Sequence, residues 1–234
     1  MKLSKEQELI LEMCESTLSL SNELGEEYRY NSIVFCLIDA IFSIGVRYES
    51  TKNTVIRYCD SLEIDRVHKN GEAPNDKHTI DDYLNYIHIV ANDDYGREKI
   101  LDNRQKTSTR NGIYKAEAVY KAAALLKSLD IQTISDIRKY EHIDNLEMKF
   151  KQIKGQKSGI SFSYFLMLVG DDNYMKIDRW LLRFVEKAIG SKQNIDQTYN
   201  DLMAVCNILK KKHPQLTPRS FDYAIWSYSK NTLN

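Results

Sequence analysis

The stretch from Asp144 to Val185 reads DNLEMKFKQIKGQKSGISFSYFLMLVGDDNYMKIDRWLLRFV and contains the signals that decide the fold. It predicts a helix, a tight turn, a second helix, a loop and a third helix. The first helix should end at Ile153, because Gly155 can adopt the positive φ that turns the chain. Ser158 is the expected N-cap of the second helix, which Gly170 should end.

The turn in this stretch has the features of a phosphate-binding site. It exposes consecutive backbone N–H groups at a helix N-terminus, which suits an anion. Lys154 and Lys157 flank it with positive charge, and the spacing of Gly155 and Gly159 would let a nucleic-acid backbone approach closely. An ordinary corner between two helices with solvated lysines explains the same residues, so both interpretations stay open.

Composition favours helices but gives no bulk signal for a nucleic-acid partner. The 234 residues include 9 Gly and 3 Pro, and long stretches without either favour helices over the many turns of an all-β fold. The 33 basic and 33 acidic residues give a formal net charge of zero. Since nucleic-acid binders usually carry a basic excess, any DNA footprint has to be local.

The rest of the chain predicts further helices and therefore an all-α fold. Ser4 is a plausible N-cap for the first of them. The expected helices cover residues 4–23, 32–44, 50–62, 79–91, 114–129, 133–139 and 144–152. Residues 65–79 and the polar, basic stretch 102–112 are expected loops.

The cysteines and the apolar segments indicate a cytoplasmic protein. Four cysteines lie far apart, at positions 14, 36, 59 and 206, and no signal peptide is visible, so we expect reduced thiols. Because metal and iron–sulfur ligands usually cluster, we expect no metal site. The most apolar stretch, near residues 33–46, contains Asp39 and is too short to span a membrane.

The segments IKGQKSGISFSYFLMLVG (153–170) and KIDRWLLRFV (176–185) resemble the helix-hairpin-helix DNA glycosylases related to endonuclease III. In that family, an LPGxGxxTA hairpin is followed by a helix and a VDTHxxR element. The matching positions are Ile153, Gly155 and Ser161 in the hairpin, and Ile177, Asp178 and Arg183 after it.

Two further segments occur in the order of that family. CLIDAIFSIGVRYEST (36–51) is similar to the helix and loop that enter the minor groove, and GIYKAEAVYKAAALL (112–126) is similar to the GxYxxKA helix. Several features depart from the pattern: Lys154 and Lys157 replace the usual hairpin Pro and second Gly, and Asp39 lies two residues from the position of the early-helix Glu of adenine-removing members. The position of the Schiff-base Lys of bifunctional members is Gly159, and the C-terminal cluster of four Cys is absent. The resemblance therefore implies base excision without strand cleavage and without an iron–sulfur cluster.

Asp178 is the catalytic residue that the resemblance implies. Base excision passes through a sugar with oxocarbenium character, and an ionised carboxylate beneath C1′ stabilises that positive charge. The same carboxylate could orient the attacking water. The alternative is structural, because Asp is a good N-cap for a helix that begins at Arg179. One side chain can serve both purposes.

The resemblance also implies residues that grip DNA and hold an extruded base. In the hairpin, the expected DNA contacts are Lys154, Gly155, Gln156, Lys157, Ser158 and Gly159. Elsewhere they are Arg47 and Tyr48, the basic-loop residues Arg104, Lys106 and Arg110, and Lys115. The expected base pocket contains Asp39, Tyr48, Tyr164 and Trp180. For each of these, a core or solvated surface role is the alternative.

These expectations describe an all-α protein of two helical lobes with a cleft between them. A central lobe would cover residues 30–142, and residues 1–29 with 143–234 would form the other. The expected function is monofunctional hydrolysis of the N-glycosidic bond of a damaged or modified base in double-stranded DNA, in repair or in defence against modified phage DNA. The alternative is a catalytically inactive helix-hairpin-helix DNA-binding protein. We expect a monomer without cofactor or membrane partner, with a monovalent cation at the hairpin as an open option.

Overall fold

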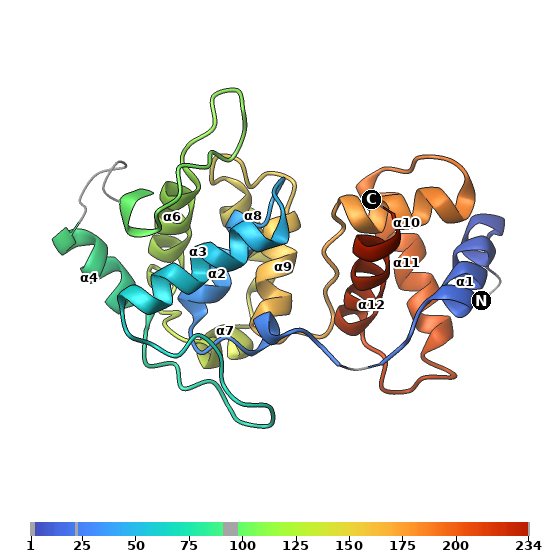
Figure 1. Ribbon diagram of the computed structural model, residues 1–234, viewed down its shortest axis with the longest axis horizontal. Helices are drawn as coiled ribbons and strands as arrows, with labels where there is room; N and C mark the ends of the chain where they lie inside the picture. Colours follow the sequence, from blue (N-terminus) through green and yellow to red (C-terminus); the bar gives the residue numbers. More distant parts are fainter. Residues whose placement is uncertain (1–2, 22, 91–97, 234) are drawn as a thin grey trace. The chain divides into compact units, whose positions relative to one another are not determined.

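The computed structural model describes residues 3–21, 23–90 and 98–233, and the described chain is all-α. It divides into two compact units (Figure 1). The central unit is Gly25–Gly170, and the terminal unit combines Met1–Leu24 with Asp171–Asn234. Each unit has its own core.

The core of the central unit is built around α2 (Ile33–Phe42), in which every residue is buried. Its sequence IVFCLIDAIF is apolar on nearly every side, so neighbours have to cover all of its faces. The Ser32 hydroxyl starts the helix by accepting the Val34 N–H at 3.0 Å. Packed against α2 are α3 (Tyr48–Ser61), α4 (Ile80–Val90), α6 (Lys115–Lys127) and α9 (Ile160–Leu168).

The two helices that flank the turn at Gly155 belong to the central unit. This corrects the predicted domain boundary, which lay between residues 142 and 143. α8 (Ile143–Lys151) follows α7 (Ile134–Lys139) and packs on α6, while α9 packs on α2 and on the short helix η1 (Glu26–Arg29). Seven of the nine residues of α9 are buried, so this helix completes the core around α2. Sequence proximity to Asp178 had placed it with the terminal helices instead.

The terminal unit is a bundle of four helices, α1 (Lys5–Thr17), α10 (Arg179–Ile189), α11 (Ile195–Leu209) and α12 (Pro218–Thr232). α10 packs against the other three. It is strongly amphipathic, with Leu181, Phe184 and Val185 buried and its basic residues on the opposite face. Burying each large apolar side chain contributes about 1.5–3 kcal/mol, and this core is what holds the bundle together.

Several helix ends differ from the sequence-based prediction, and those of α1 and α9 have a clear backbone cause. α1 ends at Thr17, because Leu18 is extended (φ −95°, ψ 138°), so the expected continuation to residue 23 is wrong. The predicted N-cap Ser4 is confirmed, with a capping box to Gln7. Ser158 does not cap α9, since Gly159 occupies the N-cap position with a φ of +76°. Residue 91, the expected end of α4, lies outside the described residues.

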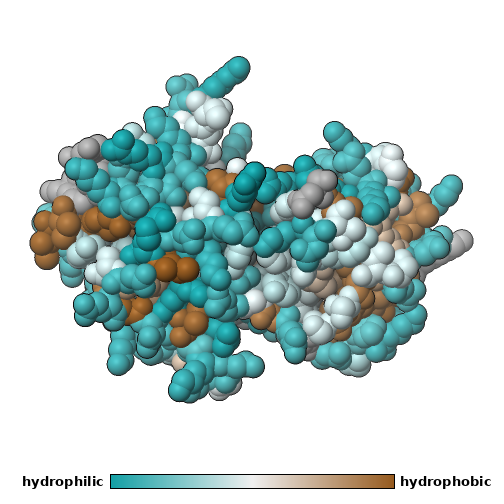
Figure 2. All heavy atoms as spheres, viewed as in Figure 1, coloured by the Kyte–Doolittle hydropathy of each residue, from teal (hydrophilic) through white to brown (hydrophobic). Residues whose placement is uncertain are grey.

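The view in Figure 2 shows a mostly hydrophilic face with scattered apolar side chains. The most exposed large apolar residues of the described chain are Ile89 at the end of α4, with 82% of its surface exposed, and Met148 on α8, with 61%. Isolated apolar residues of this kind are normal on a protein surface. Among the described helices, none combines the length and the apolar composition needed to cross a membrane.

Candidate functional site

The hairpin, defined here as residues 152–159 between α8 and α9, has the backbone geometry of an anion-binding turn. Its two glycines, Gly155 and Gly159, have φ values of +91° and +76°. The Gln156 N–H donates to the Ile153 carbonyl at 2.9 Å and closes the turn. Within the described chain, the N–H groups of Lys157 and Ser158 donate to no protein atom, and both residues are exposed. The turn therefore offers N–H groups and lysine charges to the solvent.

Gln156 has a structural role in this turn. Its side chain is buried, and its Oε1 accepts a hydrogen bond from the Ser161 hydroxyl on α9. The contact ties the turn to the first residues of α9. Gln156 therefore holds the hairpin in shape, and the exposed lysines are the groups that can reach a phosphate.

The hairpin glycines make room for protein side chains, and their role in admitting a nucleic-acid backbone stays a prediction. A Cβ on Gly155 would lie 2.2 Å from the Thr107 Cβ, and one on Gly159 would lie 2.6 Å from Lys151 Cε. The close approach at Gly155 brings the hairpin against the loop before α6. That contact joins two segments that are about 50 residues apart in the sequence.

The basic loop, residues 103–113, stands out above α6 in Figure 1. It contains Arg104, Lys106 and Arg110 and no acidic residue, as the hairpin contains two lysines and no acidic residue. The three basic residues are exposed; Arg104 forms an ion pair with the buried Glu98 at 3.0 Å, and Lys106 lies over the Tyr114 ring at 5.1 Å. Since Thr107 of this loop touches Gly155, five basic side chains lie on two adjoining loops.

Arg47 and Tyr48 lie at the start of α3, two residues before the helix start at Ser50 that the sequence predicted. Arg47 is the N-cap residue and is exposed. Two residues earlier, Gly45 has a φ of +72° with no atom within 4 Å of an added Cβ. The half-buried Tyr48 points its hydroxyl to Glu27, donating to Oε2 at 3.0 Å. Arg47 is thus available at the surface, whereas the Tyr48 hydroxyl is engaged within the protein.

Lys115 is buried, and the structure does not place it on a DNA-binding surface. Its ammonium donates to the carbonyls of Phe42 at 2.9 Å and Ile44 at 2.8 Å and to Gln105 Oε1 at 3.1 Å. These bonds use all three donors of the group. Lys115 therefore satisfies carbonyls at the C-terminal end of α2, which have no partner inside the helix.

Two of the four expected pocket residues, Asp39 and Tyr164, meet in a buried acid–tyrosine cluster with Tyr30, and Tyr48 is close enough to feel the Asp39 charge. The hydroxyls of Tyr30 and Tyr164 donate to Asp39 Oδ2 at 2.8 and 3.5 Å. Burial and the nearby Asp39 carboxyl raise the pKa of both tyrosines well above the usual range, so both hydroxyls keep their protons. Sequence reasoning missed Glu27 and Tyr30, because they precede α2 without any periodic pattern.

Asp178 is the N-cap of α10, as predicted. Its Oδ1 accepts the backbone N–H of Trp180 at 2.7 Å. The Lys176 ammonium lies 4.0 Å from Oδ2, and 18% of the Asp178 side chain is exposed. The carboxylate is therefore preorganised by one hydrogen bond and one nearby cation, with part of its surface open to a ligand.

A second carboxyl group, Asp222 on α12, is close to the same segment. It is buried, and its Oδ2 accepts the Lys176 N–H at 2.7 Å. Burial first, and then the charge of Asp178, raise the pKa of Asp222 well above its usual range. Sequence reasoning missed this residue, although Asp222, Ile225 and Ser229 follow the i, i+3, i+7 spacing of a buried helix face.

Trp180, the fourth expected pocket residue, lies in the terminal unit beside Asp178. The guanidinium carbons of Arg179 and Arg183 lie 5.0 and 5.2 Å from its ring centroid. Both arginines are exposed, so the start of α10 presents an aromatic ring between two cations. Such a surface suits phosphate or base contacts better than a closed pocket wall.

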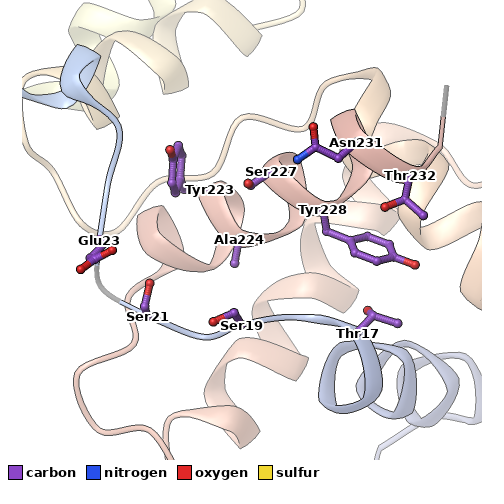
Figure 3. A pocket seen from close by; sticks show the side chains of 10 residues that line it. All are labelled: Thr17, Ser19, Ser21, Glu23, Tyr223, Ala224, Ser227, Tyr228, Asn231 and Thr232. Atoms are coloured by element: carbon purple, nitrogen blue, oxygen red, sulfur yellow. The ribbon is translucent and has the colours of Figure 1, made fainter.

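A pocket of about 380 Å³ lies in the terminal unit between α12 and the segment after α1 (Figure 3). Hydroxyl groups dominate its lining, and Glu23 is its one acidic residue. None of the residues singled out by the sequence lines it. Its lining residues are Thr17, Ser19, Ser21, Glu23, Tyr223, Ala224, Ser227, Tyr228, Asn231 and Thr232.

The described residues contain no group of three or more His, Cys, Asp or Glu that could hold a metal ion. All four cysteines are buried and free. Burial raises the thiol pKa to about 12 for Cys59 and to about 11 for Cys206, which keeps both thiols protonated at neutral pH. The cysteines therefore act as packing residues.

The chain belongs to the DUF8548 family, a domain of unknown function whose model matches residues 8–230. The match extends over parts of both units, so the hairpin, the basic loop and the Asp178–Asp222 segment all belong to this domain. No curated protein and no solved structure matches the chain significantly.

Proposed function

We propose that the protein is a monofunctional DNA glycosylase that acts as a monomer on double-stranded DNA. The N-glycosidic bond of a flipped, damaged or modified base breaks, and its electron pair leaves with the base. Water then attacks C1′ and gives up a proton, which leaves an abasic site. The central unit supplies the grip on DNA, and the terminal unit supplies the carboxylate.

The observation that carries this proposal is the pairing of the hairpin with the basic loop through Gly155 and Thr107. Two adjoining loops then offer five basic side chains, of which Arg104 is paired with Glu98, together with N–H groups that have no protein acceptor among the described residues. This local charge is what a protein with a net charge of zero needs to hold a phosphate backbone.

Asp178 supports the chemical step because its geometry is fixed before any substrate arrives. A carboxylate held by the Trp180 N–H keeps one orientation, and a preorganised charge costs no reorganisation when the oxocarbenium ion forms. Within the same unit as Asp178, the Trp180 ring, which lies beside the exposed Arg179 and Arg183, can stack on a flipped base.

The second candidate is a DNA-binding protein without catalysis. The observation in its favour is that Asp178 already has a structural task, the N-cap of α10. Such a protein would bind duplexes through the same hairpin and leave every base in place.

Incubation with duplexes that carry damaged, deaminated, alkylated or hypermodified bases, followed by alkali, tests the proposal. We expect alkali-dependent strand breaks with one class of base, which also separates repair from defence against modified foreign DNA. Borohydride should trap no covalent adduct, because Gly159 stands where bifunctional enzymes carry their Lys. An adduct that vanishes in Lys157→Ala or Lys176→Ala would contradict the monofunctional assignment.

Measuring the affinity for duplex DNA in potassium chloride and in lithium chloride tests whether a monovalent cation binds at the hairpin. A cation held by the hairpin carbonyls would make affinity depend on the identity of the ion at constant ionic strength. Equal affinities in both salts would contradict such a site.

A further inference from the structure

Asp222 of α12 holds the turn from Lys176 to Asp178 in place. Asp222 Oδ2 accepts the Lys176 N–H at 2.7 Å, and the Lys176 carbonyl in turn accepts the Asp178 N–H at 2.7 Å. Two consecutive short hydrogen bonds therefore connect α12 to the turn that leads into α10. Because 4% of Asp222 is exposed, water does not compete for this contact.

We propose that Asp222 is a positioning residue for Asp178: its buried carboxyl group, whose surroundings favour the uncharged form, accepts the Lys176 N–H and fixes the turn from Lys176 to Asp178. The inference rests on the proposed function only in the claim that positioning Asp178 affects the excision rate. The contact and the charge state concern the folded protein whether or not it excises bases.

The surroundings of Asp222 favour its uncharged form. Asp222 is buried and faces the Asp178 charge, and both effects raise its pKa. The Lys176 N–H and ammonium oppose that shift as smaller effects. Arg219, one turn earlier on α12, is paired with Asp172 at 2.9 Å, and Arg179 and Arg183 of α10 lie over Trp180. Lys176 is thus the cation that the two acids share.

One negative charge is what the proposed chemistry needs. An oxocarbenium ion is stabilised by an ionised carboxylate, and a second ionised carboxylate beside it would favour protonation of the first. A neutral carboxyl group supplies the hydrogen-bond acceptor without that cost. An amide has the same shape and also accepts a hydrogen bond, so Asp222→Asn should substitute well, whereas Asp222→Ala removes the acceptor.

Carboxyl-detected NMR of the full chain measures the charge state directly. We expect the Asp222 signal to titrate well above the ordinary Asp range and to be absent in Asp222→Asn. Amide signals of residues 176–180 should shift in Asp222→Ala and stay near wild type in Asp222→Asn. Asp201→Asn is the matched control, because Asp201 is another buried, hydrogen-bonded acid of the same unit.

Excision by the same variants measures the effect on catalysis. Misplacing a reacting group by about 1 Å costs on the order of hundredfold in rate, so Asp222→Ala should lose about that much in kcat with unchanged affinity for DNA. Asp222→Asn should retain wild-type kcat and should lose the alkaline limb of the pH–rate profile. If Asp222→Ala does not fold, the pH–rate profiles and NMR titrations of Asp222→Asn and wild type test the inference by themselves.

The inference would be overturned if Asp222 is ionised at pH 7. It would also be overturned if the amide signals of residues 176–180 do not shift in Asp222→Ala. If wild type excises no base but the NMR results are as expected, the positioning contact stands and the proposed function fails. The two failures are therefore distinguishable.

Discussion

At the scale of single residues, the structure replaces several sequence-based roles with structural ones. Lys115 and Gln156 were expected to contact DNA, yet both side chains are buried and bonded to protein atoms. Sequence alone could not separate these roles, because a Lys after a basic loop looks the same whether its ammonium faces solvent or the end of a helix. Only tertiary packing brings α2 to Lys115.

Lys115→Met should destabilise the central unit without weakening DNA binding. Removing the ammonium leaves two buried carbonyls without their donor, which costs about 1–3 kcal/mol for each unsatisfied group. Urea denaturation should show the loss, and the salt dependence of DNA binding should stay at its wild-type slope. A reduced slope with unchanged stability would place Lys115 at the interface after all.

Gly155→Ala should cost more stability than Gly45→Ala. Both glycines have positive φ, so each substitution strains the backbone by about 1–2 kcal/mol. Only Gly155 also has the Thr107 side chain within 2.2 Å of the added Cβ, whereas Gly45 has no atom within 4 Å. The difference between the two free energies of unfolding measures the contact between the hairpin and the basic loop. Equal losses would show that this contact is absent in solution.

At the scale of secondary-structure elements, sequence patterns located the helices and misplaced some of their ends. The expected cap Ser4 predicted the start of α1 correctly, and the apolar run from Ser32 placed the start of α2 within one residue. Gly155 and Gly170 were correctly expected to turn the chain, with φ values of +91° and +103°. The cap of α9 was missed, because Gly159 rather than the adjacent Ser158 has the left-handed conformation.

Binding of DNA through the two hairpin lysines should release about two counterions from the DNA. Lys154→Ala with Lys157→Ala should lower the slope of log affinity against log salt by about one for each lost phosphate contact. The matched control removes the exposed Lys69 and Lys139, which carry the same charge elsewhere on the central unit. Titrations at several salt concentrations check this. Equal slopes in the two double variants would remove the hairpin from the interface.

At the scale of the whole molecule, the division into units was the least predictable feature. The sequence separated a central segment from the terminal helices, but it could not show that α9 packs on α2 and therefore belongs to the central unit. The Asp222 contact was equally hidden, since it joins positions 46 residues apart. Resemblance drew attention to Asp178, and only packing revealed its partner.

With a formal net charge of zero, the pH dependence of stability near neutrality should reflect local groups such as Asp222. Its pKa is raised in the folded state above the unfolded value of about 3.9. Its contribution to stability is therefore fully present below that value and is lost as pH rises through the folded pKa. Thermal unfolding should show wild type losing stability over this range relative to Asp222→Asn. Parallel curves for the two proteins would contradict a raised pKa.

The excision rate of Asp178→Asn tests the central claim most directly. Asn caps a helix nearly as well as Asp, so the variant should fold, melt near wild type with a loss of at most about 1 kcal/mol, and bind duplex DNA normally. Excision of the base that wild type removes should fall by on the order of hundredfold or more, because the charge that stabilises the oxocarbenium ion is gone. Excision at the wild-type rate by a folded Asp178→Asn variant would show that Asp178 is an N-cap and that the catalytic assignment is wrong.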